Sequence, residues 1–308
     1  MASNVITPDL SEAQKQTFEN TFYALSQQKT NPFLSSDALV YVSNVGKAHN
    51  LGRIGRTELV EVNTRNPLKQ YADFDVDNRQ FSMKRFTKTF QIDAKDDVNE
   101  LIADPTSYLM KNLDYAANRT VCRQVIIGAV GAVLTGAPNA ALTSVSASDD
   151  GVISITATGG MNYSHIQKIT QNYINNDIDL IDFRGSLLCV TGKENGELMG
   201  ISQFTNNDFI STQVVNEGVA NRAGMYKVAL FAGTDASISV ANPILVEGVS
   251  TRSCVVLAPR SIAISYKLNS MRIERAADRV DSNDATIDLW IGTMRIEGPK
   301  VQILTTTI

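Results

Sequence analysis

A stretch of about thirty residues, 105–134, contains no proline after Pro105 and repeats apolar or small side chains every three or four positions. Asp104 and Pro105 mark a helix start, because aspartate caps helices and proline at the first helical position gives up no needed N–H. We predict one helix of about 45 Å, severalfold longer than the usual 11–12 residues. Such a helix acts as a spine against which the other elements pack. Its repeating positions are Leu109, Leu113, Ala117, Val121, Val125, Gly128 and Ala132.

The size and composition of the chain limit its class. With 308 residues and 43% hydrophobic content, it can build one large or two modest domains and is not disordered. It has no apolar run of about 18 residues, so we expect no membrane contact. The N-terminus lacks a secretion signal. Three separated cysteines form neither a disulfide framework nor a metal cluster, which favours a reducing compartment.

Charge is concentrated in residues 51–100, where nine basic and nine acidic side chains fall within 50 residues of a chain that is only 19% charged. The alternating pattern predicts strands. Phe86 and Phe90 share one face and Phe81 and Met83 the other, so the apolar face changes near Lys84. A twisted or bulged hairpin would explain this change. An ordinary solvated hairpin is the alternative, and strands so poor in core residues need another surface to lie against.

The remaining pattern predicts an α+β chain. An N-terminal arm carries one amphipathic helix from Ser11 to about Gln28, with Phe18 and Phe22 on its apolar face. After the long helix we expect a strand, a helix, a buried strand and a short helix. Half-buried strands form the C-terminal 55 residues. Those ranges are 152–158, about 162–176, 186–191, about 194–201, 262–268, 287–291 and 301–303.

Chemistry-bearing residues do not converge anywhere in the sequence. Only two histidines exist, His49 and His165, and neither has a partner at metal-ligand spacing. For His165, at the start of a predicted helix, we expect a surface or capping role. No serine or cysteine lies in a nucleophile motif, and Gly192-Lys193 departs from a phosphate-binding loop. We interpret the paired carboxylates Asp96-Asp97, Asp149-Asp150 and Asp177/Asp179 as solvated turns. The sequence indicates no enzyme and no cofactor.

Several segments in a fixed order resemble the major capsid proteins of tailed double-stranded DNA bacteriophages. Asn78–Lys84 (NRQFSMK) precedes the acidic run 93–97, and Ile102–Ser107 (IADPTS) opens the long helix. The sequence IIGAVGAVLTG at 126–136 is similar to the end of that helix in the family. The strands at 261–275, 286–295 and 297–303 also resemble theirs. The resemblance extends over roughly residues 5–308.

The resemblance implies an HK97-like capsid fold with an N-terminal arm, an extended β-hairpin loop, a long spine helix, and peripheral and axial domains. The arm would be residues 1–50 and the extension loop 51–95. The peripheral domain with its spine helix would be 96–160, the axial domain 161–254, and the peripheral domain's C-terminal strands 255–308. In this fold the extension loop reaches over a neighbouring subunit. Balanced charges there would form salt bridges between subunits.

The resemblance also implies a function and partners. The chain would be a structural major capsid protein that self-assembles into hexamers and pentamers of an icosahedral shell in the virion. That shell, assembled in the host bacterial cytoplasm, would enclose double-stranded DNA non-specifically, with a separate scaffolding protein and a portal. An encapsulin-like cellular compartment shell is the alternative within the fold, and an uncharacterised α/β enzyme is a second one. The expected subunit contacts are Arg53, Arg56, Glu58, Glu61, Arg65, Lys69, Asp75, Asp77, Arg79, Lys84, Arg85 and Lys88 in the loop, with Phe18 and Phe22 in the arm.

Overall fold

The computed structural model describes residues 31–34, 36–43, 48–65, 75–93, 105–137, 140–157, 159–202, 215–216, 219–231, 251–275 and 282–307. The helix expected over residues 11–28, with Phe18 and Phe22, lies outside the described residues, as does Lys69. Contacts divide the chain into two compact units. Unit 1 comprises Met1–Gln27, Phe86–Ala117 and Leu268–Leu289, and unit 2 comprises Gln28–Arg85, Asn118–Lys267 and Trp290–Ile308.

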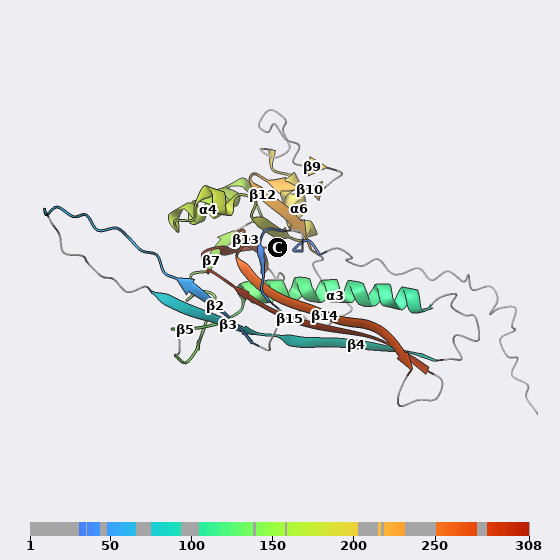
Figure 1. The fold of residues 1–308 in the computed structure, drawn as a ribbon. Coiled ribbons are helices and arrows are strands. Elements are labelled where there is room, and N and C mark those ends of the chain that lie inside the picture. Colours follow the sequence, from blue (N-terminus) through green and yellow to red (C-terminus); the bar gives the residue numbers. More distant parts are fainter. Residues whose placement is uncertain are drawn as a thin grey trace, which may run out of the picture. The chain divides into compact units, whose positions relative to one another are not determined.

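The described elements mix helices and strands along the whole chain (Figure 1). The helices are α3 (Pro105–Val130), α4 (Tyr163–Asn175), α5 (Leu180–Phe183) and α6 (Gly192–Met199). The strands are β1 (Leu39–Tyr41), β2 (Ala48–Ile54), β3 (Val76–Ser82), β4 (Lys84–Asp93), β5 (Val133–Gly136), β6 (Thr143–Val145), β7 (Ile153–Ala157), β8 (Leu187–Val190), β9 (Val215–Asn216), β10 (Val219–Ala220), β11 (Arg222–Ala223), β12 (Tyr226–Leu230), β13 (Thr251–Leu257), β14 (Ile262–Arg275), β15 (Ser282–Arg295) and β16 (Val301–Thr307).

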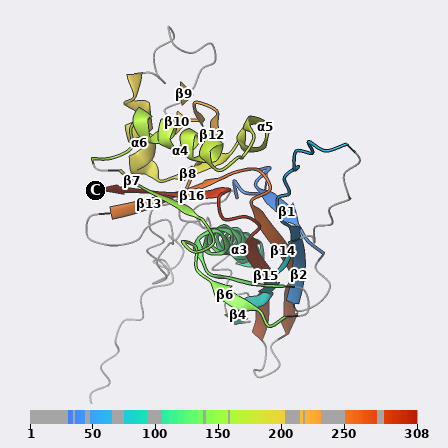
Figure 2. The ribbon, with the colours of Figure 1, turned by 90° about the vertical axis from the view of Figure 1, so that its left-hand side faces the viewer.

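A six-stranded sheet in unit 2 has the order β11-β12-β8-β13-β16-β7. It is mixed, because β12 runs parallel to β8 and β7 parallel to β16, while β13 is antiparallel to both of its neighbours. All four residues of β8 are buried, as its uninterrupted apolar sequence predicts. Helices α4 and α6 lie on one face of this sheet (Figure 2). The larger hydrophobic cluster of unit 2 therefore lies between these helices and the sheet.

Helix α4 begins at a cap that the sequence locates correctly. The Asn162 side chain accepts from the backbone N–H of His165 at 3.3 Å, and the Asn162 N–H donates to His165 Nδ1 at 3.2 Å. Burial lowers the pKa of His165, and the charge of Lys168 adds to that lowering. The neutral imidazole can then accept this bond at pH 7. The capping role expected for His165 is confirmed, and its side chain is buried instead of lying on the surface.

A four-stranded antiparallel sheet, β2-β3-β5-β6, contains the hairpin of the charged segment. Strand β3 ends at Ser82, and β4 starts at Lys84 beside β15 in a different sheet, β1-β14-β15-β4. Phe81 packs in the core of unit 2 with Val133 and Met294, whereas Phe90 packs in unit 1. The change of apolar face near Lys84 is therefore a change of sheet. The expectation of one twisted or bulged hairpin through both strands is wrong.

The long helix is four residues shorter than predicted. Helix α3 ends at Val130, and Val133–Gly136 forms β5 between β3 and β6. Valine and threonine fit a pleated sheet, so pairing with β3 outweighs the continued helical pattern here. Gly128 allows Thr293 to approach the helix closely. A Cβ there would lie 2.5 Å from Thr293 Oγ1, and that hydroxyl donates to the Gln124 carbonyl at 2.6 Å.

Replacing Gly128 by alanine is expected to destabilise the subunit by about 1–3 kcal/mol, because the added methyl group overlaps Thr293 and its hydrogen bond. Chemical denaturation of the unassembled subunit measures this change. The matched control is Gly196→Ala in α6, where nothing lies within 4 Å of the new Cβ. That variant is expected to gain up to about 1 kcal/mol from helix propensity. Equal effects at the two glycines would contradict close packing as the cause.

The start of β14 is buried on both faces, not on one. Ile262, Ala263, Ile264 and Ser265 are each 0% exposed. Strand β1 pairs with this stretch in parallel, and Ala263 packs against Phe81 and Val133. The alternation of apolar and small residues predicts a half-buried strand. In the structure, the small residues are also buried, because they fill a second packed face.

Candidate assembly site

The hairpin of β2 and β3 extends into an exposed tip. Its register runs from Ala48 opposite Ser82 to Ile54 opposite Val76. The Gly55 N–H donates to the Asp75 carbonyl at 2.7 Å, which closes the paired part of the hairpin. The described tip residues, 55–65, form no strand and are all exposed. Figure 1 shows this segment running outward beyond the end of β2.

Apolar side chains at the tip face solvent. Leu59 is 103% exposed, Val60 70% and Val62 55%, and Ile54 at the end of β2 is 73% exposed. Single exposed apolar residues are common, but several together on one projecting segment mark a surface that another molecule covers.

Most of the charged residues expected in subunit contacts are exposed. Glu58, Glu61, Arg65 and Asp75 lie on the tip or at its return, and Lys84, Arg85 and Lys88 lie on β4. The Lys88 ammonium also lies 5.5 Å from the centre of the Phe90 ring. The structure places these β4 residues in a different sheet from the hairpin. The expected contact residues thus form two separate groups.

Arg53 and Asp77 form a cross-strand pair inside the chain. They lie opposite each other in the β2–β3 ladder, and Arg53 Nε donates to Asp77 Oδ1 at 2.9 Å. Arg53 Nη1 also donates to the Ile296 carbonyl at 3.1 Å, and Thr135 Oγ1 donates to Asp77 Oδ2 at 3.1 Å. This pair joins the base of the hairpin to β5 and to the residue after β15.

The same contacts shift the pKa values of both side chains. The hydrogen bond from Arg53 lowers the pKa of Asp77; burial opposes this, and the charge of Arg53 and the Thr135 hydroxyl add to the lowering. Burial acts to lower the pKa of Arg53, but the bonds and charge of Asp77 outweigh it, so the pKa of Arg53 rises. Both side chains therefore stay ionised at neutral pH.

The stabilising contribution of Asp77 is expected to depend on pH. Because the pKa of Asp77 is lower in the folded chain than in the unfolded chain, its contribution is complete above the unfolded value. It is lost as the pH falls from there through the folded value. Urea denaturation of wild type and Asp77→Asn should show a difference at pH 7 that shrinks in acid. A difference that stays constant down to pH 3 would contradict this linkage.

Arg56 links the hairpin to the end of α4 at the surface. Arg56 Nη2 donates to the Asn176 carbonyl at 2.8 Å, and Nη1 lies 3.2 Å from Asp177 Oδ2. The side chains of Arg56 and Asp177 are 66% and 86% exposed. An exposed pair of this kind contributes at most about 1 kcal/mol. The contact therefore orients the start of the tip without holding it rigidly.

Arg79 differs from the other expected contact residues, because its side chain is only 1% exposed. Its guanidinium donates to Asp150 Oδ2 at 2.9 Å, to Asp150 Oδ1, and to the Arg295 carbonyl at 3.0 Å. This position corrects the expectation of a surface contact for Arg79. Its pattern in the sequence, a charge on an alternating strand, is the same as that of an exposed residue, so burial could not be inferred from it.

Asp150 also accepts a hydrogen bond from Arg295, so one carboxylate serves two guanidinium groups. We name Arg79, Asp150 and Arg295 the ion cluster. Burial lowers the pKa of Arg295; the Asp150 carboxylate opposes this and the charge of Arg79 reinforces it. The Asp149-Asp150 pair was expected to be a solvated turn. That expectation is wrong for Asp150, whose side chain is 9% exposed.

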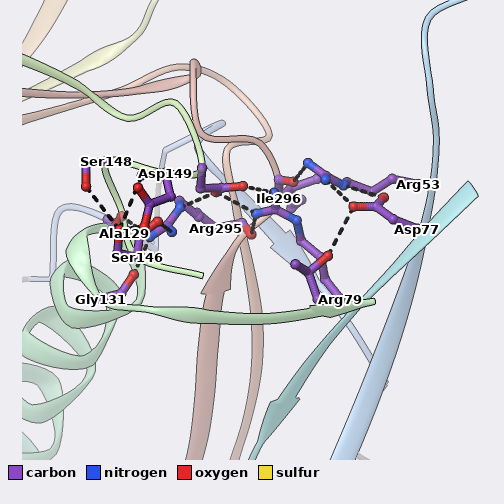
Figure 3. Close-up of polar contacts among 12 residues, drawn as sticks. Arg53, Asp77, Arg79, Ala129, Gly131, Ser146, Ser148, Asp149, Arg295 and Ile296 are labelled. Carbon is purple, nitrogen blue, oxygen red and sulfur yellow. Dashed lines mark hydrogen bonds and ion pairs between the residues drawn. The ribbon is translucent and has the colours of Figure 1, made fainter. Parts of the chain in front are cut away.

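Arg295 caps the C-terminal end of helix α3. Its Nη1 donates to the carbonyls of Ala129, at 3.3 Å, and Gly131, and its Nη2 donates to the Ser146 carbonyl at 3.2 Å (Figure 3). The last carbonyls of a helix lack partners within it and carry partial negative charge, so a cation there is favourable. The ion cluster therefore joins β3, the end of α3, the turn before β7 and the end of β15, all within unit 2.

A close backbone approach holds the Asp150 turn in place. Gly151 has a positive φ of 84°, and a Cβ at Gly298 would lie 1.8 Å from the Asp150 carbonyl oxygen. Only glycine fits at Gly298. Gly151 and Gly298 are 147 positions apart, so no local pattern in the sequence connects them.

The described residues contain neither a metal-binding cluster nor a helix able to span a membrane. Among them, no three His, Cys, Asp or Glu side chains are placed to hold a metal ion. Within that part of the chain, no helix combines the length and hydropathy needed to cross a bilayer. Cys122, Cys189 and Cys254 are buried and form no disulfide bond, and burial raises the pKa of the Cys122 thiol to about 12.

Comparison with known proteins gives a family and a fold. The family model described as phage capsid protein matches residues 10–307. The capsid structure of the cyanophage Pam1 is similar, with a TM-score of 0.67 and 12% identity over 97% of this chain and 99% of that one. The head structure of Helicobacter pylori bacteriophage KHP40 gives 0.66 and 9%, over 94% of each chain. The capsid of cyanophage P-SCSP1u gives 0.63 and 13%, over 95% and 94%. No curated protein sequence matches the chain.

Proposed function

Because the chain belongs to the phage capsid protein family, we propose that its copies close an icosahedral shell by placing the tip of the β2–β3 hairpin on neighbouring subunits. The protein is a structural component of the virion capsid and has an HK97-like fold. The observation that carries the proposal is the exposure of Leu59, Val60 and Val62 on a segment that projects from a well-packed unit. These side chains are buried only when another molecule covers them.

The HK97-like fold supports a proposed arrangement of the subunit within the shell. We assign the arm to residues 1–47 and the extension loop to 48–82, because the hairpin begins with β2 at Ala48 and β4 belongs to another sheet. The peripheral domain contains α3 and the C-terminal strands, and the axial domain corresponds to about 161–254. We propose hexamers and pentamers as the assembly units. The exposed, weak contact of Arg56 at the start of the tip supports a loop whose direction adapts to these two environments.

The partners in this proposal are proteins and DNA of the same phage. A separate scaffolding protein and a portal direct assembly in the host cytoplasm, and the shell then encloses double-stranded DNA without reading its sequence. A formal net charge of −4 supports such loose enclosure, because strong counterion-release binding needs a basic surface. We expect no catalytic activity and no cofactor.

Electron microscopy of the purified chain tests the proposed function. The chain is overexpressed in bacteria, first alone and then with the scaffolding protein of its own phage. Closed icosahedral particles built from this chain are the expected result. Failure to form any higher assembly under both conditions would refute the proposal. DNA-filled particles with a single portal vertex, isolated from infected cells, would separate a phage shell from a cellular compartment shell.

A further inference from the structure

The tip segment Thr57–Thr64 has the composition of a strand but belongs to no sheet. Its sequence, TELVEVNT, is rich in the β-branched residues that favour strands. In the described part of the chain, this segment is exposed throughout and pairs with no other strand. Its backbone N–H and C=O groups are therefore available for a sheet edge. A β-prone, apolar segment left open in this way adds readily to an unpaired strand.

Strand β4 offers a long edge of the kind such a segment needs. In the order β1-β14-β15-β4 it is the last strand, and among the described residues only β15 lies beside it. It is ten residues long, and Lys84, Thr87, Lys88 and Thr89 are exposed along it. Lysines on an edge strand oppose uncontrolled pairing of identical edges. They leave the edge open to a strand of opposite charge.

We propose that Thr57–Thr64 of one subunit adds as an extra strand to β4 in a second copy of the chain, at the edge of β4 that no described strand occupies. The inference rests on the proposed function and names the surface that receives the hairpin tip. The partner is a second copy because charge complementarity favours it. The tip segment carries Glu58 and Glu61 and no basic residue, whereas the first half of β4 carries Lys84, Arg85 and Lys88 and no acidic one.

Strand addition combines two kinds of interaction. Main-chain hydrogen bonds give affinity, and alternate side chains give specificity, as in other cases of β-augmentation. Leu59 and Val60 point to opposite faces in an extended strand, so one of them is placed beside the apolar side chains of the receiving sheet. Opposite charges across the two strands favour this pairing, while two β4 edges repel each other.

A charge exchange tests the pairing directly. One variant carries Glu58→Lys and Glu61→Lys, a second carries Lys84→Glu and Lys88→Glu, and a third carries all four changes. Each of the first two is expected to lower the yield of closed particles about tenfold or more, since like charges across an interface cost several kcal/mol. The variant with all four substitutions is expected to recover a particle yield within about threefold of that of the wild type. Denaturation of each unassembled variant confirms that the subunit itself is folded.

The outcomes separate this inference from the proposed function. If the quadruple variant assembles no better than the two double variants, the pairing of these segments is refuted. Wild-type particles would still establish the shell. If wild type forms no particles under any condition, the proposed function fails first.

Cysteine cross-linking locates the strand. Single cysteines at residues 59, 60, 61 and 62 are combined in particles with a second chain carrying Thr87→Cys, and the native cysteines are buried. Facing residues in a ladder alternate, so disulfide yield is expected to rise and fall with a period of two. The control chain carries Thr143→Cys on β6, another sheet edge. Equal yield at all four positions, a higher yield with Thr143→Cys, or no cross-link would overturn the proposal.

Discussion

Asp150→Asn is expected to destabilise the unassembled subunit by about 3–5 kcal/mol, the largest effect of any single substitution considered. The change keeps the shape of the side chain but leaves the guanidinium groups of Arg79 and Arg295, 1% and 0% exposed, without their shared negative charge. Breaking a buried ion pair by removing one partner has a cost of this size. Urea denaturation followed by circular dichroism at pH 7 measures it.

The adjacent residue provides the control for this experiment. Asp149 is exposed and accepts a hydrogen bond from Ser146 Oγ at 2.6 Å, which asparagine can also accept. Asp149→Asn is therefore expected to change stability by less than about 0.5 kcal/mol. Similar unfolding midpoints for the two variants would show that the ion cluster contributes little to the subunit.

Removing the hairpin tip is expected to abolish closed shells while leaving the subunit folded. In this variant, a two-residue glycine linker replaces residues 57–74 and connects Arg56 to Asp75. The two strands are already close at this point, because the Gly55 N–H donates to the Asp75 carbonyl at 2.7 Å. Leu59, Val60 and Val62 bury nothing in the described chain, so the free energy of unfolding should change little. In the shell, burial of each such side chain contributes about 1.5–3 kcal/mol. Each 1.4 kcal/mol lost lowers association tenfold.

Particle yield by gradient sedimentation and electron microscopy measures the effect on assembly. A length-matched variant, in which residues 57–64 alternate glycine and serine, keeps the reach of the loop but removes its side chains. We expect this variant to fail as well, because the apolar contacts are lost. Normal shells from the shortened variant would exclude the tip from assembly. Normal shells from the length-matched variant would show that reach alone is required.

Local patterns predict the elements whose determinants lie close together in the sequence. Asn162 caps α4, and Ile166, Ile169 and Tyr173 form its buried face, so this helix lies where the sequence predicts one, at about 162–176. The β8 strand follows from its apolar run. These two elements depend on short-range periodicity, which a single sequence records. The capsid fold is instead implied by the resemblance of ordered segments such as Asn78–Lys84 and Ile102–Ser107 to those of the family, and the family and structural comparisons confirm it.

The ion cluster could not be predicted, because its members are far apart in the sequence. Arg79 lies 71 positions from Asp150, and Asp150 lies 145 positions from Arg295. Each residue alone has the pattern of a surface charge or a turn. The break at Met83 and the β5 strand are missed for a related reason. Both depend on which strand lies beside the segment, and that neighbour is set by the tertiary structure.

These long sequence separations also have a consequence for the order of folding. Contacts between distant residues form slowly, because closing a long loop has an entropic cost before any contact compensates for it. Asp150 cannot meet both arginines until β3, α3 and β15 have come together. We therefore expect the cluster to form late, with low φ-values for substitutions at Asp150, and to slow unfolding more than it speeds folding. During folding, the apolar hairpin tip would then be exposed before the ion cluster anchors β3. Premature association of subunits is a hazard in that period.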